Sequence, residues 1–189
     1  MILYLCRHAS AGRRRADPLQ DERRRLDVRG QQQARQMGAA LVALGVRVDL
    51  ILASPLRRAT QTAALLAAEL GYPGAWQREA ALRPEADYAA FHALLGRYPG
   101  CEAILAVGHK PSLPACLSRL LGAPRTAVEL KKGAVAKVEI EPRRVRLQWL
   151  LTPGQLERLA DGRGPGRAIP ARPAYAAPTV KSTPKTARK

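Results

Sequence analysis

The sequence predicts an α/β fold with a mostly parallel central sheet. Short apolar runs alternate along the chain with longer segments whose apolar residues recur at helical spacing. Strands that alternate with helices in this way are typical of a parallel sheet. The composition is that of a globular domain, because 47% of the 189 residues are hydrophobic. Since only 4% are aromatic, the core must be built mainly from Ala, Leu and Val.

The first half of the chain is predicted to contain two strands and two helices. Residues 2–6 form an apolar run typical of a strand, and the charged residues 7–29 predict a loop. Residues 30–44 carry apolar side chains at helical spacing and end before a glycine, which indicates a helix. The run 50–53 predicts a second strand. Residues 55–70 predict a helix with proline near its first turn and glycine after its last residue.

The second half begins with the same alternation and then changes character. We expect a helix, a strand and a helix at residues 84–97, 103–107 and 112–121. Three short strands close together, partly antiparallel, are expected at residues 127–131, 134–140 and 145–150. Residues 153–160 predict a short closing helix.

The composition changes near Asp161, which predicts one domain at 1–162 and a tail at 163–189. The tail holds seven cations, five prolines and no acids, with few large apolar residues to offset its ordering entropy. We therefore predict a basic, Pro-rich, disordered tail. The net charge of +17 exceeds the seven tail cations, so the domain is basic too. Two interpretations stay open: the tail contacts a polyanion, or it is a solubilising end without a specific partner.

Several classes of protein are disfavoured. Three widely spaced cysteines without a CxxC pattern exclude a disulfide framework and favour a reducing compartment. The longest uncharged run, residues 36–46, is shorter than the roughly 20 residues of a membrane span, and residues 1–6 are too short for a signal peptide. We therefore expect a cytoplasmic protein without a membrane segment. Nucleotide-binding glycine loops, zinc-ligand spacings and a GxSxG elbow are absent from the sequence.

Candidate chemistry follows the predicted strands at the points where they end. The first strand leads into Arg7-His8, the second into Ser54 and the pair Arg57-Arg58, and the third into His109. In an open α/β sheet, ligands bind beyond the carboxyl ends of the strands. The helix after Ser54 also directs its positive end to that edge. Together these residues predict a pocket for a dianionic phosphoryl group with an imidazole as nucleophile.

Three motifs, in order, resemble the histidine phosphatase superfamily (phosphoglycerate mutase-like, branch 1). Arg7-His8-Ala9 resembles its RHG signature, and residues 54–63 and 108–113 resemble its SPxxRAxQTA and GHxPxL segments. The compact length, Leu82-Arg83-Pro84 and residues 149–153 are similar to small phosphohistidine phosphatases of the SixA type. The resemblance covers residues 1 to about 160. It implies a three-layer sandwich, with helices flanking a mostly parallel sheet.

The resemblance also implies roles for individual residues. His8 would attack phosphorus in line and carry a phosphohistidine intermediate, which water then hydrolyses. Arg7 and Arg58 would bind the phosphoryl oxygens, and His109 would complete the clamp and stabilise charge in the transition state. Ser54 and Arg57 are further candidates for substrate binding. No metal ion or other cofactor is implied, because Arg and His supply the positive charge.

Two positions depart from the family's pattern. Ala9 stands where glycine is usual, and we expect little effect unless the backbone there needs a positive φ. Pro84 stands where many members have a glutamate that protonates the leaving group; Glu85 is the nearest spare candidate for this acid. A missing acid forfeits roughly 10²–10⁴-fold in rate on a poor leaving group. A labile phosphoramidate needs less help, so the departure favours phosphohistidine as substrate.

The expected function is therefore metal-independent dephosphorylation of a histidine-phosphorylated signalling or phosphotransfer protein. One alternative is a phosphatase of the same type acting on a small phosphoester or a condensed phosphate. Another is a basic polyanion-binding protein with little catalysis. Residues 12–29 hold seven arginines and four acids. Either these arginines steer an acidic substrate protein, or the segment is a solvated loop with internal ion pairs.

Overall fold

The computed structural model describes residues 1–124 and 126–162; the predicted tail at 163–189 lies outside the described residues. Six strands form one sheet in the order β3-β2-β4-β1-β5-β6. They are β1 (Ile2–Arg7), β2 (Leu50–Ala53), β3 (Gln77–Arg78), β4 (Ala103–Gly108), β5 (Val135–Glu141) and β6 (Arg144–Leu151). The first four of these are parallel, and β5 and β6 form an antiparallel hairpin along β1. The predicted α/β class with a mostly parallel sheet is confirmed.

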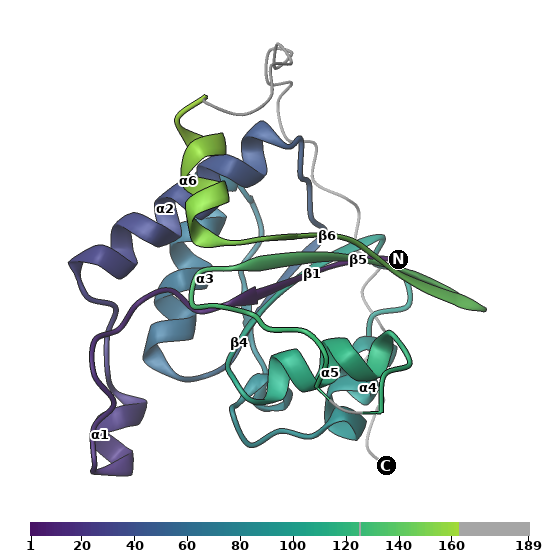
Figure 1. Cartoon of the computed structure of the whole chain (residues 1–189), viewed down its shortest axis with the longest axis horizontal. Helices are drawn as coiled ribbons and strands as arrows, with labels where there is room; N and C mark the ends of the chain where they lie inside the picture. The colour runs from purple at the N-terminus through teal and green to yellow at the C-terminus, as the bar shows by residue number, and fades with distance from the viewer. Residues whose placement is uncertain (125, 163–189) are drawn as a thin grey trace, which may run out of the picture.

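Helices cover both faces of the sheet, which gives three layers (Figure 1). One face packs against α2 (Val28–Ala43), α3 (Arg57–Leu70) and α6 (Pro153–Ala160), and the other against η1 (Ala80–Leu82), α4 (Tyr88–Gly96) and α5 (Ser112–Leu120). The alternation of side chains along a strand explains the two cores. In β1, Tyr4 and Cys6 belong to the first core, and Leu3 and Leu5 to the second.

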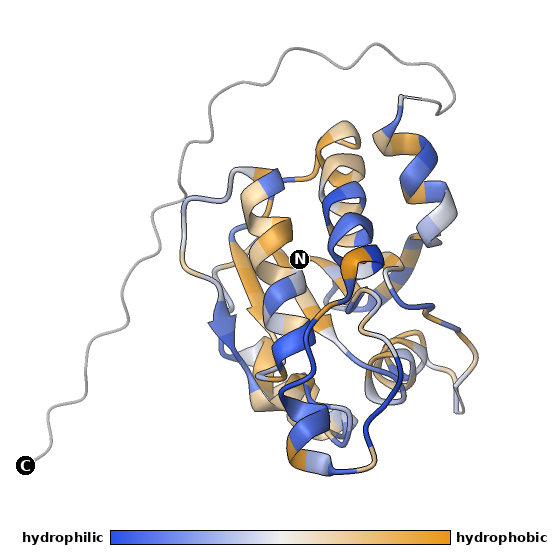
Figure 2. Ribbon diagram, turned by 90° about the vertical axis from the view of Figure 1, so that its left-hand side faces the viewer, coloured by the Kyte–Doolittle hydropathy of each residue, from blue (hydrophilic) through white to orange (hydrophobic). Residues whose placement is uncertain are grey.

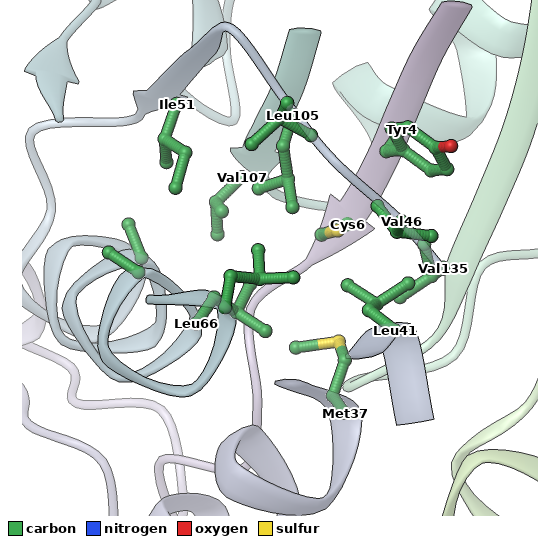
Figure 3. Packing of buried hydrophobic residues seen from close by; sticks show 14 of the residues in the cluster. Tyr4, Cys6, Met37, Leu41, Val46, Ile51, Leu66, Leu105, Val107 and Val135 are labelled. Carbon is green, nitrogen blue, oxygen red and sulfur yellow. The ribbon is translucent and has the colours of Figure 1, made fainter. Parts of the chain in front are cut away.

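The first core shows how small and branched side chains fill the space between sheet and helices (Figure 3). Met37 and Leu41 of α2 and Leu66 of α3 are fully buried beside Cys6 and Leu105 of the sheet. Figure 2 shows the strands coloured mainly as hydrophobic, whereas the segment that leads into α1 (Pro18–Glu22), at the bottom of the view, is mainly hydrophilic. No helix in the described part of the chain is long and apolar enough to cross a membrane.

The ends of the helices follow local side-chain chemistry. Asp27 caps α2 by accepting a hydrogen bond from the Gly30 amide. Gly71 ends α3 in the left-handed region, with a φ of 60°. Asp87 caps α4, so this helix begins at residue 88 and not at residue 84 as predicted. Because the capping carboxylate fixes the first turn, the preceding proline segment stays outside the helix.

The prediction of a strand at residues 127–131 is wrong, because the structure has no strand there. The amides of Ala127 and Val128 donate to the Ser118 hydroxyl instead of to a neighbouring strand. Helix α1 lies inside the predicted loop 7–29, and the short elements β3 and η1 were not predicted. Segments of two to five residues carry too few side chains to show a periodicity.

Candidate active site

The candidate site lies where β1 and β4 end, beside the first turn of α3. Arg7 pairs with Gly108 in the parallel register of these strands, so the residues that follow them are neighbours. The His8 amide donates to the Gly108 carbonyl at 3.0 Å, and the ring centroids of His8 and His109 are 4.9 Å apart. Both rings line a cavity of about 630 Å³ together with Arg7 and Arg58. The structure therefore brings the four principal predicted residues into one place.

His8 is held with one ring nitrogen engaged and the other available. Its Nδ1 lies 2.7 Å from the Ala9 carbonyl oxygen. Because a carbonyl only accepts, Nδ1 carries the proton and Nε2 keeps its lone pair. Burial lowers the pKa of His8 to about 3; the Ala9 bond opposes this shift, and nearby Arg58 and Arg7 add to it. The ring is therefore neutral near pH 7, as a nucleophile must be.

His109 is also buried, and neither of its ring nitrogens has a hydrogen-bond partner within the described chain. Burial, together with the neighbouring His8 and Arg58, lowers its pKa to about 2. A buried polar atom without a partner is costly, so both ring nitrogens are available to bind a ligand. A bound dianion would supply the partner and would favour the protonated ring.

Arg7 and Arg58 are anchored at one end and unpartnered at the other. An Nη1 of Arg7 donates to the Leu130 carbonyl at 2.8 Å, and an Nη1 of Arg58 donates to the Asp21 carbonyl at 2.8 Å. The Asp21 carboxylate lies 3.4 Å from the same Arg58 nitrogen. Within the described residues, the buried Nε atoms of both arginines have no partner. Two fixed guanidinium groups with spare donors suit the oxygens of a phosphoryl group.

The structure places the remaining candidates differently. Arg57 is exposed and lies outside the cavity lining, because consecutive helical residues face directions roughly 100° apart and Arg58 takes the inward one. Ser54 is buried below the lining, where its hydroxyl accepts from the Leu56 amide at 3.4 Å. Glu85 lines the cavity but forms an ion pair with Arg83. The placement of Arg57 and Ser54 does not support substrate contact.

Ala9 needs no unusual backbone conformation. Only glycines have positive φ among the described residues, so the methyl group at Ala9 carries no strain of that kind. Gly30 has a clearer structural role: a Cβ there would lie 1.8 Å from the Ser10 carbonyl oxygen. The start of α2 can therefore pack directly on the loop that follows His8.

Thr62 is a functional candidate that the sequence reasoning did not single out. It is fully buried on α3, and its hydroxyl accepts from the Ala9 amide at 3.3 Å and donates to the Arg58 carbonyl at 2.7 Å. One hydroxyl thus joins the His8 loop to the helix that carries Arg58. The sequence could have pointed to Thr62, because it lies inside the segment 54–63 that resembles a motif of the family. Asp21, Arg83 and Lys132 also line the cavity; Arg83 lies within the Leu82-Arg83-Pro84 motif, whereas no sequence motif included Asp21 or Lys132.

We expect Thr62→Val to lower kcat by about tenfold while changing KM little, because the Ala9 amide loses its acceptor and the His8 loop its link to Arg58. Thr62→Ser keeps the hydroxyl and should restore most of the activity. Steady-state kinetics of both variants test this, with thermal melts to compare their folding. A loss in Thr62→Ser as large as that in Thr62→Val would contradict this role, because serine keeps the hydroxyl that makes both hydrogen bonds.

The two lowered histidine pKa values also predict how stability depends on pH. In the unfolded chain each ring titrates near about 6.5, whereas burial lowers the folded values to about 3 and about 2. Below the unfolded value, the unfolded state binds more protons. Stability should therefore be fully present above pH about 6.5 and be lost as the pH falls towards the folded values.

Thermal melts across this range measure the effect. His109→Ala should flatten the fall in Tm between neutral and mildly acidic pH relative to the wild-type chain. An unchanged slope in His109→Ala would contradict this assignment.

No group of three or more His, Cys, Asp or Glu that could hold a metal ion is found within residues 1–124 and 126–162.

Comparison with known proteins agrees with the fold and the motifs. Residues 3–92 match the model of the histidine phosphatase superfamily (branch 1). An uncharacterized protein of Picosynechococcus sp. (strain PCC 7002) is 41% identical over 118 residues, which are 60% of this chain and 68% of that protein.

Solved structures share the architecture at lower identity. The protein histidine phosphatase SixA complexed with tungstate matches with a TM-score of 0.75 and 24% identity, over 82% of this chain and 99% of that chain. The alpha-ribazole phosphatase from Shigella flexneri matches with a TM-score of 0.63 and 21% identity, over 81% of this chain and 97% of that chain. At these identities, the two structures establish the fold.

Proposed function

The chain belongs to the histidine phosphatase superfamily (branch 1), and we propose that it removes phosphoryl groups from phosphohistidine on a signalling or phosphotransfer protein. The observation that carries the proposal is the set of unpartnered nitrogens around one cavity. Within the described chain, Nε of Arg7, Nε of Arg58 and both ring nitrogens of His109 are buried without partners. They surround the space beside the His8 ring and would bind the oxygens of a phosphoryl dianion.

The proposed reaction has two steps. Nε2 of His8 attacks phosphorus as the bond from phosphorus to the substrate nitrogen breaks, and the substrate imidazole leaves with its electron pair. Arg7, Arg58 and His109 hold the three phosphoryl oxygens as charge shifts among them. Water then attacks the phosphohistidine, loses a proton and restores neutral His8, and inorganic phosphate is released.

The carboxylates of the cavity support a substrate whose leaving group needs no acid. Burial raises the pKa of Glu85, but the hydrogen bond from Arg83, a hydrogen bond from its own backbone and the charge of Arg83 together outweigh this and leave the pKa below the ordinary value. The pKa of Asp21 is also lowered, because hydrogen bonds from the Arg15 amide and the Arg24 side chain outweigh the effect of burial. Both groups are therefore ionised and cannot donate a proton near pH 7.

A phosphorylated imidazole does not require such a donor. When its other ring nitrogen is protonated, the ring leaves as a neutral molecule, whereas an alkoxide must gain a proton from an acid. Pro84, which also lines the cavity, offers no proton. The site thus favours a phosphoramidate over an alkyl phosphate ester.

A comparison of substrates tests the proposal. The wild-type chain is incubated with EDTA and either a histidine-phosphorylated phosphotransfer domain or p-nitrophenyl phosphate, beside His8→Ala and the control His92→Ala. We expect a higher kcat/KM on the phosphorylated domain, lost in His8→Ala and retained in His92→Ala. Higher kcat/KM on the phosphate monoester would favour the small-phosphoester alternative. No turnover of either substrate would leave a polyanion-binding protein as the better account.

A further inference from the structure

A second cavity, of about 710 Å³, adjoins the catalytic one. The two share Gly12, Arg15 and Arg24 in their linings. The lining of the second cavity consists mainly of arginines, namely Arg13, Arg15, Arg23, Arg24 and Arg25. Asp27 is the one acid in this lining. We call it the arginine cavity. It is formed by the segment between β1 and α2, and the reaction proposed above uses none of its exposed arginines.

Most of the positive charge in this cavity is uncompensated. Asp27 already accepts from the Ser10 hydroxyl, the Gly12 amide and the Gly30 amide. Arg24 is engaged by the Asp21 carboxylate at 2.9 Å and by two backbone carbonyls. Arg13, Arg15, Arg23 and Arg25 are exposed, and within residues 1–124 and 126–162 these four form no ion pair. Their charges are free to attract an anionic partner.

We propose that the arginine cavity binds an acidic segment of the substrate protein, beside the histidine that enters the catalytic cavity. The inference rests on the proposed function and identifies the kind of partner that function requires. The shared lining means that a partner engaged at one cavity also lies against the other.

The exposure of these arginines favours an acidic protein surface over a small anion. Tight capture of a small anion needs buried donors that converge, as the catalytic cavity provides through Arg7, Arg58 and His109. Exposed arginines make weak contacts that salt screens, but they accelerate the encounter with an oppositely charged protein. Several such arginines around an open cavity therefore suit a brief encounter between proteins.

The test reverses charge in the full-length chain. Arg13, Arg23 and Arg25 are replaced together by glutamate. The matched control makes the replacements Arg143→Glu, Arg144→Glu and Arg78→Glu. All three positions are exposed and outside the linings of both cavities: Arg143 lies in the turn between β5 and β6, and the other two lie in strands. The hairpin tip that carries the first two projects on the side opposite α1 (Figure 1). Each variant is assayed on an acidic, histidine-phosphorylated phosphotransfer domain and on p-nitrophenyl phosphate, at low and high salt.

We expect the cavity variant to raise KM for the phosphorylated domain by about tenfold or more at low salt, with kcat little changed. The effect should shrink at high salt, the control should show a much smaller rise, and p-nitrophenyl phosphate should be turned over as by the wild type. Equal effects in the cavity variant and the control would overturn the proposal. So would an equal loss on both substrates.

A binding measurement keeps this result separate from the proposed function. Fluorescence anisotropy of a labelled oligoglutamate peptide is recorded with the His8→Ala chain, with and without the cavity substitutions. The peptide should bind more weakly, by about tenfold, when the three arginines are replaced, even if the wild type fails to dephosphorylate histidine. Unchanged peptide binding would overturn the cavity's role, whatever the enzyme's substrate proves to be.

Discussion

Replacing His8 with alanine is expected to lower kcat/KM by at least about 10⁴-fold on any substrate that the enzyme turns over. The reason is the arrangement around the ring: Nδ1 is engaged by the Ala9 carbonyl, and Nε2 is the nitrogen left to attack phosphorus. In the described part of the cavity, the carboxylate side chains are those of Asp21, Glu22 and Glu85, and each is paired with an arginine. None can take over the attack without leaving its partner.

The control for this prediction is His92→Ala. His92 lies exposed on α4 with its ring 5.8 Å from that of Tyr88, and it is not part of the cavity lining. Its removal should leave kcat/KM within about twofold of the wild-type value. Thermal melts of the variants show whether each is folded. A folded His8→Ala variant that keeps more than a few per cent of the activity would contradict the assignment of His8 as nucleophile.

Replacing Arg58 with alanine is expected to lower kcat by about 10²–10³-fold, the effect of removing one fixed donor to a developing charge. Arg58 is 4% exposed, and burial lowers its pKa, so its guanidinium is held in a poorly solvated place where its charge acts strongly. Lysine cannot replace it fully, because the single nitrogen of an ammonium cannot reproduce the planar fork in which Nε and the Nη atoms donate from separate nitrogens. Arg58→Lys should therefore recover only part of the loss.

Arg57→Ala is the matched control, since it removes the same side chain one residue earlier on the same helix. Arg57 is exposed and outside the cavity lining, so kcat should change by less than about twofold. Steady-state kinetics on p-nitrophenyl phosphate and on a phosphorylated domain compare the two variants directly. Similar losses in Arg57→Ala and Arg58→Ala would contradict the assignment of Arg58, and not Arg57, as the residue of the first turn of α3 that binds the phosphoryl group.

Much of this architecture could be predicted from the sequence because its strands are apolar runs and its longer helices are periodic. The strand ends also located both cavity histidines, since parallel strands of one sheet end at the same edge. The sequence did not contain the strand order. The pairing of Arg7 with Gly108, which sets His8 beside His109, joins positions about a hundred residues apart.

Other features depend on contacts that no local pattern reveals. Residues 127–131 have the composition of a strand, but Ser118 supplies the hydrogen-bond partner that a strand would otherwise need. Asp21 holds Arg58 from 37 residues away. The link made by Thr62 depends on how α3 packs against the loop after β1. Helix α1 has five residues, too few for a periodic signal.

The central claim is that phosphate passes through a covalent bond to Nε2 of His8. Rapid quenching of the wild-type chain with a radiolabelled, histidine-phosphorylated domain tests it most directly, with EDTA present throughout. The account predicts an acid-labile, alkali-stable label on His8, identified by mass spectrometry, that forms and decays fast enough to account for turnover and is absent from His8→Ala. Full turnover with no labelled enzyme, or with the label on another residue, would contradict it.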